Sequence, residues 1–226
     1  MGVYLFRIFG STCVGVYALA TDKVLILPRQ VPEHRSAVLG DWLGVPVLKT
    51  SVGGSVLIGP LLCANSKGIL VPHTVMDEEF RALQALEAEH GMRVGVMDGT
   101  PVTAFGNLVL ANDRGAIVHP RFGRRTMKAI EDVLDVEVVK GTIAGLPYVG
   151  SLACATNKGV LAHPDIFEGE RELIEDVLKV PVETGTVNSG IRMVALGLIA
   201  NSRAAVAGFA TTGREMAVIG RGLGVA

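Results

Sequence analysis

Apolar and polar positions along this chain recur at a spacing of 44 to 47 residues. In the clearest copy, two apolar runs flank the polar turn Ala64 to Gly68. Asparagine and glycine tolerate positive φ and serine hydrogen-bonds locally, so this segment is typical of a β-hairpin turn. Equivalent turns are anchored at Thr21, Asn112, Thr156 and Asn201, and with Asn65 they give spacings of 44, 47, 44 and 45 residues.

Two further features recur in phase with these turns. A small residue lies six positions before each anchor, which indicates a tight bend or a close approach of two backbones; the five are Gly15, Gly59, Gly106, Gly150 and Ala195. After each turn comes the end of a strand, marked by Pro28, Pro72, Pro120, Pro164 and, in the fifth copy, Gly208. Three features with one period predict an internal repeat, and units this short must share a core with their neighbours.

Each copy predicts a strand, a second strand, a helix and a third strand. In the first copy these are a hairpin at 12–20 and 24–27, a helix at 33–43 with Val38, Leu39, Trp42 and Leu43 on one face, and a strand at 45–48. The second helix begins near Asp77, where acidic residues favour the first turn, and a strand follows at 93–96. The next two copies carry helices around 127–134 and 173–178, and strands at 136–139 and 180–182.

The fifth copy ends without a third strand. Its hairpin spans 193–206 and its helix 212–221, whereas an unassigned strand, residues 3–8, stands at the start of the chain. We infer that strand 3–8 completes the fifth module, which closes the ring and removes the open sheet edges that invite aggregation. The expected organisation is one domain over 1–226, with repeats at 10–53, 54–100, 101–145, 146–190 and 191–226 plus strand 3–8.

Composition is that of a globular chain with a substantial core, because 49% of the 226 residues are hydrophobic and 19% are charged. No apolar run reaches the roughly 18 residues of a membrane span, and the first ten residues lack a signal-peptide cleavage site. Three cysteines without a C-x-x-C pair fit a reducing compartment. We therefore expect a cytoplasmic protein that does not bind membranes.

A net charge of −1 does not favour a non-specific nucleic-acid binder, which usually shows a basic excess. One local basic patch is present, at Arg121, Arg124, Arg125 and Lys128. We interpret this patch as the solvated start of a helix.

Several segments along the chain carry a resemblance to the translation initiation factor 6 family of archaea and eukaryotes. It extends over essentially the whole chain and rests on the order and spacing of the segments rather than on one motif. A chain that ends at Ala226, without a long polar extension, resembles the archaeal form. The matching segments are Thr103 to Asn107, Leu110 to Asp113, His119-Pro120, Glu137-Val138, Gly141 to Gly145, Val149 to Ser151, Asn157 to Gly159, Gly185 to Asn188 and Thr211 to Met216.

This resemblance implies an α/β pentein fold, in which five αβ modules surround a pseudo-fivefold axis with a narrow central channel. It also implies binding to the large ribosomal subunit, mainly to a ribosomal protein near the sarcin–ricin loop. Family members occupy the face that meets the small subunit and so keep the subunits apart; eukaryotic members also act in large-subunit maturation. The expected protein is a non-enzymatic monomer without a cofactor, since a closed ring needs no partner to hide its sheet edges.

Penteins also include guanidine-modifying enzymes, which resemble one another in a late cysteine nucleophile with a histidine and acidic residues. Here Cys63 and Cys154 occupy a repeat position that is otherwise Leu19, Leu110 or Ile199. A free cysteine packs in such a core position as a small hydrophobe. Cys13 falls in the predicted first strand, and no cysteine follows Cys154. A guanidino-group hydrolase or transferase on the same fold is the first alternative, and the absence of a late cysteine argues against it. The second alternative is an assembly scaffold without anti-association activity.

His119 and His163 are repeat-equivalent residues, each directly before a proline. Metal binding would require further histidine, cysteine or acidic ligands to converge on them, and none is patterned nearby. We expect both histidines to be structural or exposed, and we expect no metal.

For the ribosome-facing surface we predict the end of the ring beside the repeated small residues. Asn107 is the leading candidate, because it directly follows Gly106 where the other copies carry Val16, Pro60, Ser151 and Leu196, and the fold alone does not require an asparagine there. Pro60 departs from the basic residue common in eukaryotic relatives. Turn geometry is the alternative explanation for the whole candidate set, which is Gly10, Ser11, Gly15, Pro60, Asn107 and Ser151.

Overall fold

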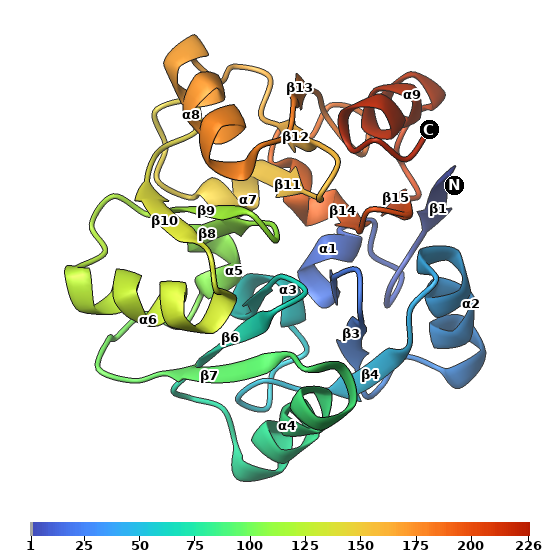
Figure 1. Ribbon diagram of the computed structural model, residues 1–226. Coiled ribbons are helices and arrows are strands. Elements are labelled where there is room, and N and C mark those ends of the chain that lie inside the picture. Colours follow the sequence, from blue (N-terminus) through green and yellow to red (C-terminus); the bar gives the residue numbers. More distant parts are fainter. Residues whose placement is uncertain (1) are drawn as a thin grey trace.

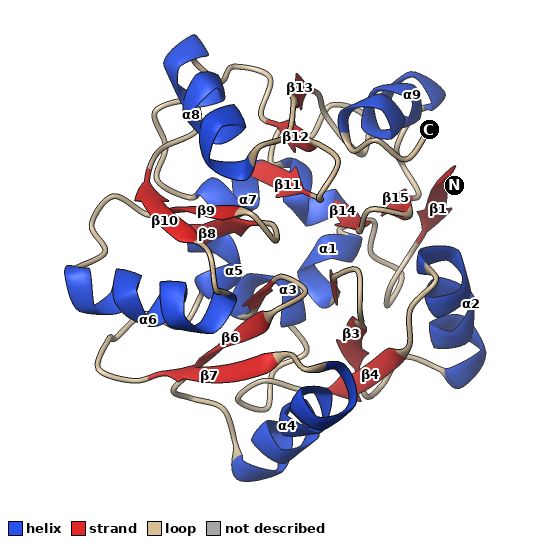
Figure 2. Cartoon of the chain, viewed as in Figure 1, coloured by secondary structure: helices blue, strands red, loops and turns tan. Residues whose placement is uncertain are grey.

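Five three-stranded sheets surround one axis in the computed structural model, which describes residues 2–226 (Figure 1). In each sheet a central strand pairs antiparallel with one neighbour and parallel with the other. The long helices lie at the outside of the ring, and short helical turns lie near its centre (Figure 2). This architecture is the five-module pentein ring that the repeats and the family resemblance predicted.

The modules follow one another along the chain. The first comprises α1 (Val14–Tyr17), β2 (Leu19–Ala20), β3 (Leu25–Pro28), α2 (Glu33–Leu43) and β4 (Val47–Thr50). The second comprises α3 (Ile58–Leu61), β5 (Cys63–Ala64), β6 (Gly68–Pro72), α4 (Asp77–His90) and β7 (Arg93–Met97). The third comprises α5 (Phe105–Leu108), β8 (Val109–Ala111), β9 (Gly115–Val118), α6 (Arg124–Leu134) and β10 (Glu137–Lys140). The fourth comprises α7 (Val149–Leu152), β11 (Ala153–Ala155), β12 (Val160–Ala162), α8 (Glu168–Leu178) and β13 (Val182–Thr184). The fifth comprises the 3-10 turn η1 (Val194–Gly197), β14 (Leu198–Ala200), β15 (Ala204–Gly208), α9 (Gly213–Gly222) and β1 (Gly2–Phe6).

For the first strand of each hairpin, the prediction is wrong in the first half of the segment, which is helical. Within residues 12–20, the helical turn α1 is followed by the short strand β2, and Cys13 lies directly before α1. The other copies likewise have a short helical turn followed by a strand of two or three residues. A short apolar run has no periodicity that separates strand from buried helix, so the pattern could not show this turn. The strands predicted at 45–48 and 180–182 begin two residues later, since Gly44 and Lys179 in the left-handed conformation end the preceding helices.

Strand β1 closes the ring as predicted. It pairs parallel with β15, from Gly2 opposite Ala204 to Phe6 opposite Gly208, so the two ends of the chain share one sheet (Figure 1). The Trp42 ring of α2 stacks on Tyr4 at 4.5 Å and meets Phe6 edge-on at 5.8 Å. The predicted core lies between modules rather than within them. One cluster, for example, joins Val24 and Ile26 of the first module to Leu83 and Leu86 of the second.

Hydrogen bonds of the anchor side chains hold neighbouring modules together. The Asn65 carboxamide oxygen accepts from the backbone N–H groups of Lys67 and Gly68, which fixes its own turn. Its Nδ2 donates to the carbonyls of Asn112 (3.1 Å) and Leu134 (2.8 Å) in the next module. The second bond satisfies an open carbonyl at the end of α6. Asn112 and Asn201 make the equivalent pairs of bonds, and the Thr156 hydroxyl bonds Leu223.

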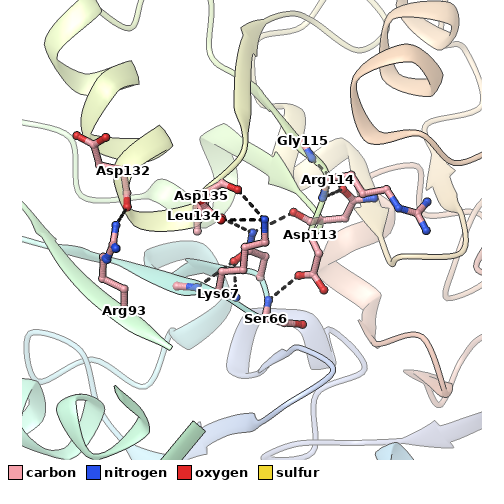
Figure 3. Close-up of polar contacts among 12 residues, drawn as sticks. Ser66, Lys67, Arg93, Asp113, Arg114, Gly115, Asp132, Leu134 and Asp135 are labelled. Carbon is pink, nitrogen blue, oxygen red and sulfur yellow. Dashed lines mark hydrogen bonds and ion pairs between the residues drawn. The ribbon is translucent and has the colours of Figure 1, made fainter. Parts of the chain in front are cut away.

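Basic side chains two positions after the anchors reinforce the same contacts. Lys67 Nζ donates to the Asp135 carbonyl at 2.7 Å and also forms an ion pair with its carboxylate (Figure 3). Lys23, Arg114 and Arg203 donate likewise to carbonyls at or just beyond the ends of long helices. Positive charge is favourable at a helix C-terminus because of the helix dipole. The residue between the anchor and the basic residue connects one hairpin turn to the next. In the second module, for example, the Ser66 N–H donates to the Asp113 carboxylate at 2.7 Å (Figure 3).

Removal of residues 1–8 will destabilise the whole ring, because β15 loses its parallel partner and Trp42 loses two aromatic contacts. We expect the midpoint of thermal unfolding to fall by at least about 10 °C, which corresponds to roughly 3 to 5 kcal/mol for a chain of this size. Circular dichroism melting of the full and truncated chains measures the effect. An unaltered melting temperature would show that β1 is dispensable for closure.

Replacement of Asn65 by alanine should lower the free energy of unfolding by about 3 kcal/mol, because buried donors and acceptors lose their partners. Asn65→Thr should cost clearly less, since threonine serves as the anchor in the first and fourth copies. Urea unfolding of both variants measures the difference. Equal costs would contradict the role assigned to the hydrogen bonds of the anchor side chain.

Candidate functional site

The short helical turns and the N-termini of the long helices lie on one side of the ring. The two parallel strands of a module end on this side, where the chain enters the long helix and later the next module. In the second module, Glu79 near the start of α4 accepts hydrogen bonds from Gly53 and Gly54 in the connecting turn, at 2.7 and 2.9 Å. We call this side the helical-turn face, and the side with the β-hairpin turns the hairpin face.

Close backbone contacts on the helical-turn face require the repeated small residues. The turns α1, α3, α5, α7 and η1 each contact two neighbours and form an inner ring (Figure 1). A Cβ atom on Gly59 would lie 1.8 Å from the Gly15 carbonyl oxygen, and one on Gly106 would lie 1.8 Å from that of Gly59. Such distances exclude a side chain, so the predicted close approach of backbones is confirmed.

The structure brings four of the candidate residues into this inner ring. Gly15, Pro60, Asn107 and Ser151 lie in α1, α3, α5 and α7. Asn107 is half-buried, and within residues 2–226 its carboxamide makes no hydrogen bond. Ser151, by contrast, is buried and 4% exposed. Of the four, Asn107 therefore carries the polar side chain that is open to solvent.

Gly10 and Ser11 lie in the connecting turn between β1 and α1. Ile8 and Ser11 bridge each other across this turn, and Gly10 is exposed with a φ of 77°, which favours glycine. The Ser11 hydroxyl accepts the Cys13 N–H at 3.1 Å. Both residues thus have a role in turn geometry, and the turn is on the helical-turn face.

Exposed apolar side chains gather on the helical-turn face, which sequence reasoning missed. Nine of the ten large apolar residues exposed within the described chain lie in its connecting turns, directly before short turns, or at and near the starts of long helices; Val38 is the tenth. A sequence signal was present in Met76 and Phe167, which occupy N-cap positions usually taken by small polar residues. The nine are Phe9, Leu57, Met76, Leu146, Tyr148, Phe167, Ile191, Met193 and Phe209.

Three glutamates tie the connecting turns to the long helices, an arrangement that we call the carboxylate latch. Glu79, Glu170 and Glu215 are the third residues of α4, α8 and α9. Each accepts two N–H bonds from a connecting turn and one from its own helix N-cap. Burial alone would raise the pKa of Glu215, but the bonds from Thr212, Thr186, Gly190 and Ser189 outweigh burial and lower the pKa to about 2.

An axial cavity of about 110 Å³ corresponds to the expected central channel, and Cys63 and Cys154 line it with Leu19, Leu110 and Ile199. Burial raises the pKa of each of the two thiols to about 12. The thiolate is the reactive form of cysteine, so both groups are poor nucleophiles. Their packing with leucine and isoleucine agrees with the predicted core position.

The two repeat-equivalent histidines stabilise the local chain. Nδ1 of His119 accepts the Arg121 N–H, and Nδ1 of His163 accepts the Asp165 N–H, each at 3.1 Å. Burial, together with the positive charge of Arg121, lowers the pKa of His119. Across residues 2–226, no three histidine, cysteine or acidic side chains converge as metal ligands. In the basic patch, Lys128 forms ion pairs with Glu131 and Asp132 of its own helix.

The fold and this face define a pentein in which the short turns of the five modules form an inner ring of touching backbones. The sequence comparison identifies it more narrowly: a model of the eIF-6 family matches residues 3–222, and the chain belongs to this family. Its relatives include proteins named translation initiation factor 6. That of Nitrosopumilus maritimus is 44% identical over 98% of both chains, and that of Pyrococcus furiosus is 46% identical over 95% of both.

A solved structure with a weaker similarity is a mutant of DDAH from Pseudomonas aeruginosa complexed with citrulline. It is 13% identical, with a TM-score of 0.46, over 92% of this chain and 73% of that chain. For this chain, no helix within residues 2–226 is long and apolar enough to cross a bilayer.

The latch predicts acid sensitivity with a defined sign. Because the pKa of Glu215 falls from 4.5 to about 2 in the folded state, its contribution to stability is complete above pH 4.5. That contribution is lost as the pH falls from 4.5 towards 2. We expect Glu215→Gln to unfold at lower urea concentration than the wild type at pH 7, with a smaller difference at pH 3. A difference that stayed constant with pH would contradict a role for the ionised carboxylate.

Proposed function

We propose that this protein binds the large ribosomal subunit through its helical-turn face and thereby prevents the small subunit from joining. Membership of the eIF-6 family and the names of its relatives as translation initiation factors support a role in translation. The contact that the family resemblance implies is a ribosomal protein close to the sarcin–ricin loop. The cytoplasm is the corresponding compartment.

Asn107 carries this proposal. Its position in the inner ring is filled by Val16, Pro60, Ser151 and Leu196 in the other modules, so the ring does not need a carboxamide there. The group is partly exposed and makes no hydrogen bond within the described chain. A partly exposed carboxamide, which offers both donors and an acceptor, is suited to hydrogen-bond another protein chain.

The nine exposed apolar side chains support a protein partner on the same face. Exposed apolar groups with polar surroundings mark protein contact sites. Phosphate contacts instead depend on lysine and arginine, and the chain as a whole has a charge of −1. The hairpin face is less suitable, because its basic side chains are bonded to helix ends.

A protein can block subunit association by occupying the joining surface, without catalysing a reaction. A closed ring of 23.7 kDa that covers the joining surface binds the free large subunit and excludes its complex with the small one. A ligand that binds only one state shifts an equilibrium towards that state by mass action. The proposed activity is therefore non-enzymatic, in keeping with the raised pKa values of Cys63 and Cys154.

Asn107→Arg should weaken binding to the large subunit by roughly tenfold or more, a loss of about 1.4 kcal/mol. The reason is that a bulky cation then occupies the centre of the contact. Gln84→Arg, at an exposed position on α4, is the matched control and should bind like the wild type. Both variants should melt within about 2 °C of the wild type, because surface substitutions have small effects on stability.

Sucrose-gradient sedimentation tests the proposal directly. Purified large and small subunits are mixed at associating magnesium concentrations, with and without the protein. The proposal predicts that the coupled peak collapses and that the protein travels with the large subunit. Binding with unaffected joining would instead indicate an assembly factor, and a protein that stays at the top of the gradient would overturn the proposed function. Intact binding by Asn107→Arg would show that the wrong face was chosen.

A further inference from the structure

The carboxylate latch is present at three of the five module junctions. At these junctions a hydroxyl residue at the end of a parallel strand faces the glutamate, as in the bonds from Thr142 to Glu170 (2.6 Å) and from Thr186 to Glu215 (2.7 Å). Ser51 and Glu79 form the third pair. The common design is thus a hydroxyl on the strand and a carboxylate on the helix.

The junction between β1 and α2 replaces both members of this pair with arginine. Arg7 directly precedes the bridge residue Ile8, as Ser51 precedes Val52, and Arg35 is the third residue of α2, as Glu79 is of α4. The Arg35 Nη2 donates to the backbone carbonyl of Arg7 at 2.5 Å. A neutral and a negative side chain have therefore been exchanged for two neighbouring cations.

Aromatic rings hold these two guanidinium groups in place. The Arg35 guanidinium carbon lies 4.4 Å from the centre of the Phe6 ring, and that of Arg7 lies 4.5 Å from the centre of the Phe209 ring. Within residues 2–226 neither arginine forms an ion pair with a carboxylate. A cation in the first turn of a helix also opposes the helix dipole. The bond from Arg35 to the Arg7 carbonyl ties α2 to the junction, but it leaves both positive charges without a carboxylate partner within residues 2–226, and an anionic ligand would balance them.

The arginines border an open pocket of about 640 Å³ on the helical-turn face. Its lining is mainly apolar, and the rings of Phe9 and Phe209 are 49% and 54% exposed. Gly10 of the candidate binding set lies at the same pocket. The remaining lining residues are Leu5, Phe6, Gln30 and Pro32. A ligand that complements this pocket has apolar bulk and negative charge.

We infer that the pocket binds an acidic segment of a protein, with a carboxylate paired to Arg35 and Arg7 and an apolar side chain among the phenylalanines. Guanidinium groups bind carboxylates through two parallel hydrogen bonds. The apolar lining favours a peptide over RNA, whose backbone would need more basic contacts. That the segment belongs to the large subunit rests on the proposed function; that the pocket takes an acidic peptide does not.

Arg35→Glu is the decisive variant, because it installs the residue that three other modules carry and should preserve folding. The probe is the peptide acetyl-Asp-Phe-Glu-Leu-amide, titrated while the fluorescence of Trp42, the only tryptophan in the sequence, is followed. Trp42 contacts Phe6 of the pocket, so binding should change its emission. We expect saturable binding to the wild type and at least a tenfold loss in Arg35→Glu and Arg35→Ala.

Thr126→Glu is the matched control, since it installs a glutamate at the equivalent position of α6, away from the pocket, and should bind the peptide normally. The amide analogue acetyl-Asn-Phe-Gln-Leu-amide should not bind. Equal peptide binding by wild type and Arg35→Glu, or no binding at all, would overturn the inference. Tighter, Arg35-dependent binding of a ten-residue uridine oligonucleotide would overturn the choice of a protein segment.

Sedimentation with large subunits separates this inference from the proposed function. If wild type binds and Arg35→Glu is released while Gln84→Glu, at an exposed position on α4, remains bound, the pocket contacts the subunit. If Arg35→Glu binds as the wild type does, a subunit contact at the pocket is excluded while the proposed function stands. If the wild type itself does not bind, the proposed function fails, and Arg35-dependent peptide binding still supports the pocket.

Discussion

The structure depends on anchor side chains of the hairpin turns that form hydrogen bonds both within their own turn and to the next module. A short strand and a four-residue turn cannot hold a module in place, so the anchor must fix its own hairpin and also reach the next module. Asn65 does both with one carboxamide, and its partner Leu134 is an otherwise open end of a helix. The same kind of contact at Asn112, Thr156 and Asn201 places helix ends, hairpin turns and cores in register. Closure by β1 then supplies the last strand from the opposite end of the chain.

This use of polar groups makes the two sides of the ring physically different. On the hairpin face, amide and cationic side chains form hydrogen bonds within the protein, as Asn112 and Arg114 do with carbonyls at the end of α8. On the helical-turn face, the inner ring is held by glycine contacts such as that between Gly59 and Gly106, which need no side chain, and glutamates bond the connecting turns outside it. Its surface positions are therefore free to carry apolar residues such as Tyr148 and Phe209. That division explains how a pseudo-symmetric scaffold can present a single side for binding.

Departures from the repeat are the most informative positions on that side. The carboxylate latch is the commonest arrangement at the junctions, so its exchange for the two cations Arg7 and Arg35 supports an anionic ligand at that junction. Asn107 is an exception of the same kind within the inner ring. Both lie on the helical-turn face, and each differs from its repeat equivalents in hydrogen-bonding capacity or charge.

The sequence by itself determined the number of modules, the order of the outer helices and the closing role of the N-terminal strand, because these follow from periodicity. It also singled out Asn107 by comparison among copies. Only the tertiary structure decided that residues 14–17 are helical, since an apolar run of that length suits either form. The structure alone also brought Arg7 to Arg35, and Phe9 to Phe209, into one pocket. Periodicity predicts that β1 closes the ring, but it does not show which side chains of β1, α2 and the segment after β15 then meet.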